Sequence, residues 1–211
     1  MIQSSGRGRF LVFEGIDGAG KTTQIDLLES YLLQKGKRVA RSAEPTDSPT
    51  GRLLREALAG KTPRTACEMA ALFALDRIGH NVDPENGIEA KLAAGFDVIT
   101  DRYYYSSLAY QGAETDEGWV RDLNLNCPEI RRPDLCVFLD LSPEESMARI
   151  TKGRSELEIY ETPERLARVR AQFFRVFGQL PRDNIKIVNA ARPIEEVQAE
   201  IRKIVDRTAP L

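Results

Sequence analysis

Histidine and cysteine are scarce in this chain of 211 residues, which contains one histidine, His80, and three cysteines. The cysteines, Cys67, Cys127 and Cys136, lie far apart in the sequence and form no Cys-x-x-Cys pair. A structural zinc site normally needs four cysteine or histidine ligands at short spacings. The sequence therefore argues against a zinc site and favours reduced thiols in a cytoplasmic protein.

Long apolar segments and an excess of one charge are also lacking. The beginning, MIQSSGRGRF, has no apolar core of signal-peptide length. No apolar run approaches the roughly 20 residues of a membrane span. The 30 Lys and Arg residues balance 32 Asp and Glu residues, which gives a net charge of −2. We therefore expect no membrane and no nucleic acid as partners, although a local basic pocket is compatible with this balance.

The chain does contain a regular alternation of short apolar runs and helix-like patterns, which is typical of a parallel sheet covered on both faces. The apolar runs predict five strands, at 9–14, 37–45, 96–101, 135–141 and 184–190. Helical patterns occupy 22–36, 51–60, 66–80, 84–95, 104–113, 142–150, 163–179 and 193–208. We expect a single α/β domain over residues 1–211, with a loose tail at 1–8. The most polar stretch, TKGRSELEIYETPE at 151–164, predicts either a solvated connection or a mobile lid.

The stretch FEGIDGAGKTTQ, which joins the first strand to the first helix, fits the pattern G-x-x-x-x-G-K-[ST]. The glycines allow successive backbone N–H groups to turn toward phosphate oxygens, and the following helix adds its positive N-terminal end. Lys21 is placed to reach the β and γ phosphates, and the Thr22 hydroxyl is placed to bind Mg²⁺. This P-loop pattern, with a strand before it and a helix after it, predicts a nucleoside triphosphate site rather than an ordinary tight turn.

Three classes of P-loop protein remain to be separated: GTPases, motor-type ATPases and kinases. The chain has no Asn-Lys-x-Asp motif for reading guanine, which argues against a GTPase. A kinase needs a second substrate site, and Asp101 and Arg102 end the third strand, where parallel sheets form their ligand crevice. Arg102 suits a second phosphate, and Asp101 suits a magnesium-bound water or the acceptor phosphate. The alternative for this pair is a surface ion pair.

Two further stretches suggest a pocket for a base. In LFALDR, Phe73 and Arg77 share one helix face, which predicts either a stacking ring with a donor to a base carbonyl or a core ring beside a solvated arginine. In DRYYYSSLAYQG, the three consecutive tyrosines cannot share a helix face, and aromatic residues there are often core. Ser107, Tyr110 and Gln111 recur at helical spacing and could line a polar pocket together.

In this order, these stretches resemble the thymidylate kinases, which are P-loop nucleoside monophosphate kinases. The resemblance covers nearly the whole chain and rests on FEGIDGAGKTTQ, EPTDSPTGRLLRE, FALDR, DRYYYSSLAYQG, RRPDLCVFLDLSPEESMAR and EIYE. DRYYYSSLAYQG separates this family from the adenylate and guanylate kinases. The resemblance implies a P-loop NTPase fold with a five-stranded parallel sheet, a short lid at 151–163, a homodimer, and Mg²⁺-dependent phosphoryl transfer from ATP to dTMP.

The resemblance also implies which residues bind each substrate. Phe73 would stack on thymine, Arg77 would donate to its carbonyl, Tyr110 would lie under the deoxyribose, and Arg102 would hold the phosphate. Asp17 would meet the 3′-hydroxyl end and help organise the metal. The remaining residues implied for dTMP are Glu44, Pro45, Arg55, Ser107, Gln111 and Tyr160. For ATP they are Gly15, Gly18, Ala19, Gly20, Lys21, Thr22, Thr23, Arg149 and Arg192, and for the metal Thr22 and Asp101.

The chain departs from the family pattern at the group that would contact the transferring phosphoryl. One branch of the family has a P-loop arginine where this chain has Gly18, and the other branch supplies the cation from the lid. The lid here offers Lys152 and Arg154, but its common Asp/Glu-Arg-Tyr/Ile-Glu pattern reads Glu-Ile-Tyr-Glu at 158–161. Both lid cations therefore stay open as the catalytic group.

The sequence thus predicts a cytoplasmic kinase that makes dTDP from dTMP and ATP. No strong general base is required, because the acceptor phosphate is already ionised at neutral pH, and this agrees with the near absence of histidine. Two alternatives stay open: a kinase for another pyrimidine nucleotide or a deoxynucleoside, and a P-loop switch protein that hydrolyses ATP slowly while it binds a partner.

Overall fold

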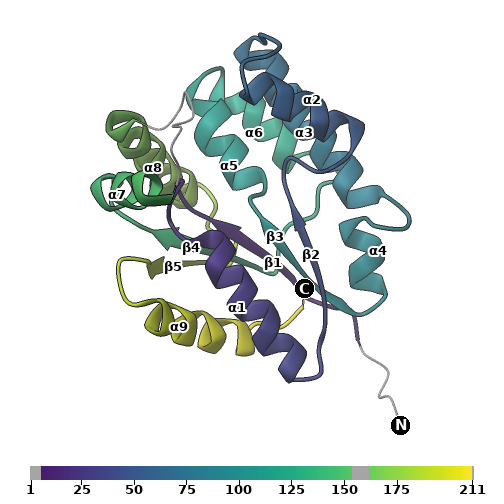
Figure 1. Ribbon diagram of the computed structural model, residues 1–211. Helices are drawn as coiled ribbons and strands as arrows, with labels where there is room; N and C mark the ends of the chain where they lie inside the picture. The colour runs from purple at the N-terminus through teal and green to yellow at the C-terminus, as the bar shows by residue number, and fades with distance from the viewer. Residues whose placement is uncertain (1–5, 154–161, 211) are drawn as a thin grey trace.

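The computed structural model describes residues 6–153 and 162–210. Five parallel strands form one sheet in the order β2-β3-β1-β4-β5 (Figure 1). The fold class predicted from the sequence is confirmed, and each predicted strand is present; β3 has the predicted bounds and the other four are slightly shorter. The strands are β1 (Phe10–Glu14), β2 (Arg38–Ala43), β3 (Phe96–Asp101), β4 (Leu135–Asp140) and β5 (Ile185–Asn189).

Helices cover the sheet on both sides, as the alternation of patterns predicts. The first half of the chain contributes α1 (Lys21–Gln34), α2 (Pro49–Leu58), α3 (Ala66–Val82), α4 (Ile88–Ala93) and α5 (Tyr104–Tyr110). The second half contributes the 3₁₀ turn η1 (Gln111–Ala113), α6 (Glu117–Leu125), α7 (Pro143–Gly153), α8 (Pro163–Gly178) and α9 (Ile194–Asp206). Helix α6 was not predicted, the helix expected at 84–95 is only α4, and the one expected at 104–113 is divided between α5 and η1.

Alternation along β1 explains the layers, because successive side chains of a strand point to opposite faces of the sheet. Phe10 and Val12 belong to the core shared with α3, α5 and α8, whereas Leu11 and Phe13 belong to the core shared with α1 and α9. Helices α1 and α9 lie together on their side of the sheet (Figure 1). Each fully buried Leu or Phe stabilises the fold by about 1.5–3 kcal/mol, so both faces contribute to stability.

The end of the predicted tail is part of the fold. Gly8 is buried, and its N–H group donates to the carbonyl of Leu92 at 3.0 Å. Arg7 forms an ion pair with Glu89. The expectation of a loose tail is therefore wrong for residues 7 and 8, while 1–5 lie outside the described residues.

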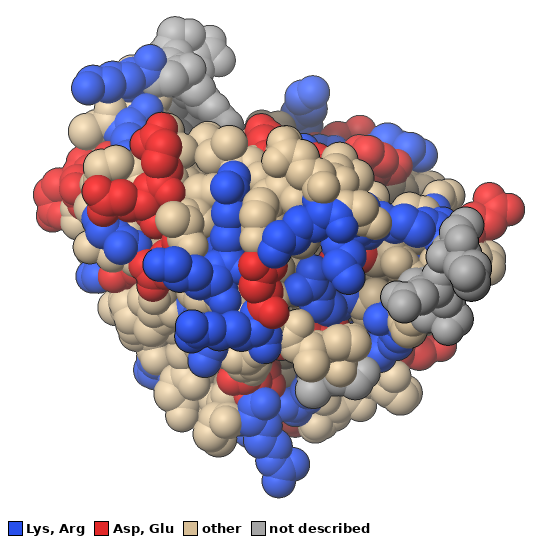
Figure 2. Space-filling model, turned by 90° about the horizontal axis from the view of Figure 1, so that it is seen from below, with Lys and Arg blue, Asp and Glu red and all other residues tan. Residues whose placement is uncertain are grey.

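The described residues contain no helix that is long and apolar enough to cross a membrane. On the face seen from below, Lys and Arg side chains gather in the middle with Asp and Glu side chains among them (Figure 2). Both signs of charge therefore share this face, in agreement with the small net charge of the chain.

Candidate active site

The loop from Gly15 to Gly20 has the backbone that its glycines predict. Gly18 and Gly20 have φ angles of +73° and +89°, in the left-handed region that favours glycine. A Cβ atom at Gly18 would lie 2.9 Å from the carbonyl oxygen of Ser146 and 3.1 Å from a side-chain carbon of Ile150, both on α7. The arginine that one branch of the family has at this position would therefore strain this backbone, which gives the departure at Gly18 a physical reason.

Lys21 places its amino group inside this loop. Its side chain is buried, and Nζ donates to the carbonyl oxygens of Gly15 and Ile16 at 3.1 and 3.3 Å. Burial, together with the nearby positive charge of Arg102, lowers the pKa of Lys21. Among the residues that the structure describes, no side chain caps the N-terminus of α1, and Thr22 and Thr23 are exposed in its first turn. The N–H groups and the positive end of the helix are thus open to an anion.

Arg102 links the end of β3 to the P-loop. Its guanidinium forms a 2.5 Å ion pair with Asp17 and donates to the Gly15 carbonyl at 3.3 Å and to Ser106 Oγ at 3.1 Å. Its φ angle is +66°, which is uncommon for a residue with a side chain and is often found at functional sites. The prediction that Arg102 lies beside the P-loop agrees with this placement.

Glu14 is a site residue that the sequence did not reveal. It is fully buried at the end of β1, where one carboxylate oxygen accepts from the Tyr103 N–H at 2.9 Å and the other from Ser106 Oγ at 2.7 Å. Burial raises its pKa, and the charges of Arg102 and Lys21 oppose that shift. Glu14 therefore fixes the turn that follows Arg102. A glutamate at the end of an otherwise apolar strand was the available signal.

Beside Arg102 lies a cavity of about 190 Å³. It brings together most of the residues predicted for a base, a sugar and a phosphate. The predicted residues that line it are Asp17, Glu44, Pro45, Phe73, Arg77, Arg102, Ser107, Tyr110 and Gln111. The lining residues that the sequence did not indicate are Leu58, Met69, Tyr103, Ser106, Glu114 and Arg165.

Arg77 is buried in the wall of this cavity, with only 1% of its surface exposed. It forms a 2.6 Å ion pair with Glu44 and donates to Ser107 Oγ at 3.2 Å and to Asn124 Oδ1. The alternative of a solvated arginine beside a core ring is therefore wrong. Its Nε atom is buried and has no hydrogen-bond partner within the described residues. A buried donor of this kind is costly unless a ligand accepts from it.

The aromatic residues divide between core and cavity. Tyr103, Tyr104 and Tyr105 are all fully buried, so the core alternative holds for the three consecutive tyrosines, and Tyr103 also reaches the cavity. The Tyr110 ring packs under the Arg102 guanidinium, 5.4 Å from its central carbon, and edge-on against Phe173. Burial raises the pKa of Tyr110 to about 12, so its hydroxyl stays protonated.

A second cavity, of about 280 Å³, lies on the other side of the P-loop. Arg149 and Arg192 line it, together with Gly18, Ala19, Gly20 and Thr23. Arg149 donates to the Ala190 carbonyl at 2.8 Å, and Arg192 pairs with Glu200. The structure therefore gathers most of the residues predicted for ATP around one hollow beside the helix N-terminus.

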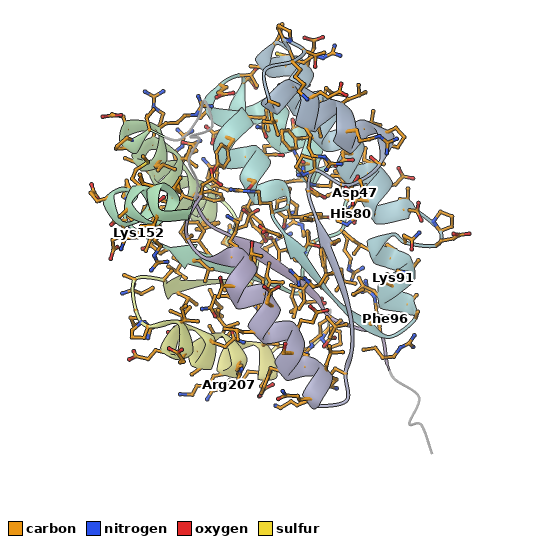
Figure 3. The ribbon with its side chains drawn as sticks, in the orientation of Figure 1. Asp47, His80, Lys91, Phe96, Lys152 and Arg207 are labelled. Carbon is orange, nitrogen blue, oxygen red and sulfur yellow. The ribbon has the colours of Figure 1, made fainter. Side chains whose placement is uncertain are left out.

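Two predicted residues of the described chain, Arg55 and Lys152, line neither cavity. Arg55 donates to the Pro45 carbonyl at 2.9 Å and pairs with Asp47, so it supports the wall without being part of the lining. Lys152 is exposed near the end of α7, on the opposite side of the molecule from His80 (Figure 3). Arg154 and Tyr160 lie outside the described residues, as does most of the predicted lid.

The two residues predicted for Mg²⁺ fit that ion in part. Asp101 Oδ1 is a buried carboxylate oxygen with no hydrogen-bond partner in the described part of the chain. Thr22 offers an exposed hydroxyl at the start of α1. Oxygen ligands of these kinds suit Mg²⁺, which usually takes few protein ligands and keeps its phosphate and water ligands. The described residues contain no cluster of three acidic, histidine or cysteine side chains, so a preformed all-protein metal cage is not found among them.

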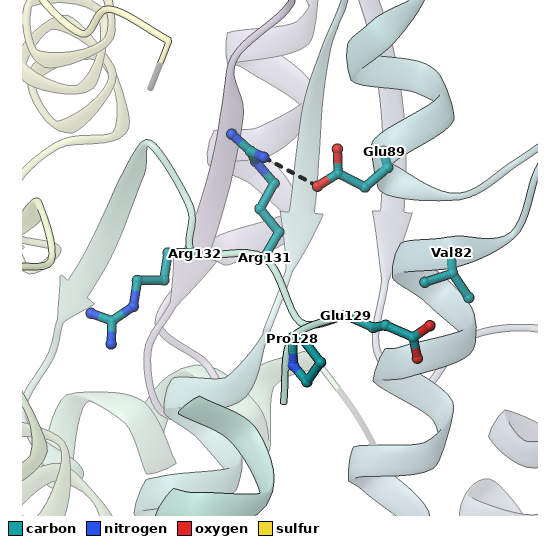
Figure 4. A pocket seen from close by; sticks show the side chains of 6 residues that line it. All are labelled: Val82, Glu89, Pro128, Glu129, Arg131 and Arg132. Carbon is teal, nitrogen blue, oxygen red and sulfur yellow. Dashed lines mark hydrogen bonds and ion pairs between the residues drawn. The ribbon is translucent and has the colours of Figure 1, made fainter. Parts of the chain in front are cut away.

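Larger hollows elsewhere lack this chemistry. One of about 480 Å³ is lined by Val82, Glu89, Pro128, Glu129, Arg131 and Arg132. In Figure 4, Arg131 points toward Glu89, with which it pairs at 3.1 Å, and Arg132 turns away. This hollow is open, its lining carries both signs of charge, and it shares no residue with the P-loop. The smaller cavity beside Arg102 is therefore the stronger candidate for a substrate site.

Known proteins resemble this chain over nearly its full length. A family model described as thymidylate kinase matches residues 13–201. A probable thymidylate kinase of Thermococcus gammatolerans is 41% identical over 209 residues, which cover 95% of this chain and 97% of that protein. A thymidylate kinase of Leifsonia xyli is 38% identical over 204 residues, which cover 94% of this chain and 95% of that protein. The chain belongs to the thymidylate kinase family.

Proposed function

We propose that this protein phosphorylates dTMP, with the cavity between Arg77 and Arg102 as the acceptor site and the P-loop as the ATP site. The activity of its family is transfer of the γ-phosphoryl group of ATP to dTMP, which gives dTDP and ADP. The observation that carries the assignment to the cavity is the buried Arg77. Its unpartnered Nε–H calls for an acceptor such as a base carbonyl.

The rest of the cavity supports the same orientation of the nucleotide. Arg102 belongs to the lining together with Asp17 of the P-loop, so a phosphate held by Arg102 would lie beside the donor site. Phe73 and Tyr110 offer rings for the base and the sugar. Arg77 at the base and Arg102 at the phosphate thus account for both polar ends of one nucleoside monophosphate.

Catalysis in this arrangement needs positioning and positive charge rather than proton transfer. The acceptor phosphate oxygen is already ionised and acts as the nucleophile. Lys21 and Arg102 neutralise the charge that builds up around the transferring group. We assign one further cation to the lid, either Lys152 or Arg154, because position 18 of the P-loop is a glycine and has no side chain to supply it.

Mg²⁺ is proposed as the cofactor, held by the Thr22 hydroxyl and by Asp101, directly or through water. When bound, it supplies charge neutralisation to the phosphates of ATP. The support is the buried, unpartnered Asp101 Oδ1.

A homodimer in the cytoplasm is proposed as the working form. The support for self-association is exposed apolar surface on two helices that contact each other, with Leu53 of α2 43% exposed and Leu75 of α3 56% exposed. The support for the location is the use of ATP and the three free thiols of Cys67, Cys127 and Cys136. Light scattering after size exclusion would measure the mass in solution, and a mass of one chain at micromolar concentration would contradict the dimer.

The test of the function is a panel of acceptors in a coupled assay of ADP release. We expect dTMP to stimulate release strongly, and dCMP, dGMP, dAMP and thymidine to stimulate it weakly. A preference for another pyrimidine monophosphate or for thymidine would support a related kinase instead. Slow ADP release that no acceptor stimulates would support the P-loop switch and overturn the proposal.

A further inference from the structure

One buried and one partly buried residue that do not line the acceptor cavity contact Arg77 or the carboxylate that pairs with it. The first is Asn124 of α6, whose Oδ1 accepts from Arg77 NH1. The second is His80, whose Nδ1 lies 3.0 Å from Oε1 of Glu44, the carboxylate that pairs with Arg77. Neither residue is among those that line the cavity. Both therefore act on the cavity only through Arg77 or Glu44.

The orientation of Asn124 is fixed by its own helix. Only 1% of its surface is exposed, and its amide Nδ2 donates to the Val120 carbonyl at 2.8 Å. A reversed amide would place an NH₂ group against the guanidinium, donor facing donor, and would lose the bond to Val120. Helix α6 therefore presents one acceptor oxygen to Arg77 in a fixed direction.

His80 fixes the carboxylate of Glu44 in a similar way. Arg77 and His80 are three residues apart on α3, so they lie on the same side of that helix. His80 contacts Oε1 and Arg77 contacts Oε2, so each oxygen of one buried carboxylate has its own partner. The carboxylate and the imidazole side chains are 2% and 7% exposed. Figure 3 places His80 beside the segment after β2, which carries Glu44 and Asp47. With His80 in place, Glu44 cannot turn away from the guanidinium.

These contacts leave one N–H group of Arg77, at Nε, without a partner among the described residues. NH1 is engaged by Asn124 and Ser107. NH2 pairs with Glu44 Oε2 at 2.6 Å. The Nε–H group therefore remains for an acceptor, and its direction depends on the groups that hold NH1 and NH2.

We propose that His80 and Asn124 are positioning residues that hold Arg77 ready to read the edge of the acceptor base. The proposal rests on the function proposed above, in which the cavity binds a nucleoside monophosphate. A guanidinium held in one place donates to a carbonyl such as that at position 4 of thymine. It faces an amino group, donor against donor, at the same position of cytosine. A guanidinium free to turn would avoid that conflict, so base selection depends on the two residues that restrain it.

The test measures the ratio of catalytic efficiencies for dTMP and dCMP in His80 variants. In His80→Leu, which lacks a donor to Glu44, we expect the preference for dTMP to fall at least about tenfold, the size expected when one buried hydrogen bond is lost. The fall should come mainly from a higher KM for dTMP, with the KM for ATP unchanged. His80→Asn places an amide donor where Nδ1 was and should keep most of the preference.

Further variants separate positioning from folding. His80→Gln places its amide donor near the position of Nε2 instead, so it should lose the preference for dTMP that His80→Asn keeps. Because His80→Gln and His80→Asn are both polar replacements, they still test the proposal if His80→Leu fails to fold. Asn124→Leu removes the acceptor toward Arg77 and should lose the preference. Asn124→Asp keeps an acceptor but loses the bond to the Val120 carbonyl, so it should lose less of the preference than Asn124→Leu. When Arg77 is already replaced by Met, His80→Gln should not change the dTMP-to-dCMP ratio of catalytic efficiencies any further, because the residue that it positions is gone.

The inference would be overturned if His80→Gln lowered the catalytic efficiencies for dTMP and dCMP equally. It would also be overturned if His80→Gln changed the dTMP-to-dCMP ratio as much in the Arg77→Met background as in the wild type. The same conclusion would follow if His80→Asn and His80→Gln behaved alike. A wild-type enzyme that releases ADP with dTMP but does not prefer it to dCMP would also overturn the inference. A wild-type enzyme that no acceptor stimulates would instead overturn the function itself, so the two failures are distinguishable.

Discussion

Removal of the Arg102 guanidinium is expected to weaken dTMP binding far more than ATP binding. Arg102 contacts Asp17, the Gly15 carbonyl and Ser106, and it lines the proposed acceptor cavity together with Asp17 and Ser106. A guanidinium makes two parallel, charge-assisted hydrogen bonds to a phosphate. The Arg102→Ala variant should therefore lose about 3 kcal/mol of dTMP binding, which corresponds to about two orders of magnitude in Kd.

The unusual backbone of Arg102 provides a matched pair of variants. At a φ angle of +66°, alanine is strained, whereas glycine is not. Arg102→Gly should be more stable to unfolding than Arg102→Ala by about 1 kcal/mol, because the left-handed conformation costs roughly that much for a residue with a Cβ. Both variants lack the guanidinium and should lose dTMP affinity equally.

Isothermal titration with dTMP and with an ATP analogue would measure the two affinities, and chemical denaturation would measure stability. Arg41→Ala is a suitable control, because Arg41 is an exposed arginine that pairs only with Asp26 and Glu29 in the described structure. Equal losses for both nucleotides would refute the reasoning. So would recovery of dTMP affinity in Arg102→Gly, since the loss would then come from backbone strain.

Three other outcomes are expected. Lys21→Ala should abolish phosphoryl transfer without unfolding the protein, since an interaction with transition-state charge is often worth about 3 kcal/mol or more; near-normal turnover would contradict the P-loop assignment. Tyr110→Ala should narrow the preference for dTMP over its ribonucleotide, because an unpaired buried 2′-hydroxyl costs about 1–3 kcal/mol beside the ring; an unchanged ratio of catalytic efficiencies would make Tyr110 an ordinary core residue. Hydrogen bonds from Lys35 and Tyr31 lower the pKa of Asp206 in the folded protein. The ionised carboxylate therefore stabilises the fold at pH values above 3.8, its ordinary pKa, and this stabilisation is lost as the pH falls through the lowered pKa of the folded state. The difference in unfolding free energy between the wild type and Asp206→Asn should accordingly be present at pH 7 and shrink toward pH 2, and a difference independent of pH would contradict that sign.

The sequence was informative where structure depends on neighbours along the chain. The P-loop glycines, Lys21 and the first strand and helix lie within one continuous segment, so their spacing predicts both the turn and its ligand. The five strands were likewise visible as apolar runs, because parallel strands are buried on both faces. The short helices were predicted less well. Helix α6 was missed, although its nine residues, EGWVRDLNL, include four apolar side chains and Asp116 caps its start; its place is decided by packing against η1 and α5.

What only the tertiary structure decided is which distant residues meet and what burial does to them. Glu14 contacts residues 103 and 106 across the sheet, and the burial of Arg77 depends on Glu44, Ser107 and Asn124 from three other parts of the chain. A single sequence shows that Arg77 shares a helix face with Phe73, but both a solvated and a buried arginine satisfy that spacing. Arg77 is buried because it lies in the cavity wall, which has little exposed surface. A buried charge is stable there only if an opposite charge and hydrogen-bond acceptors surround it. Those partners come together only when the sheet is assembled, so the sequence determined the glycine-rich turn and the fold class, and the tertiary structure determined how Arg77 is held.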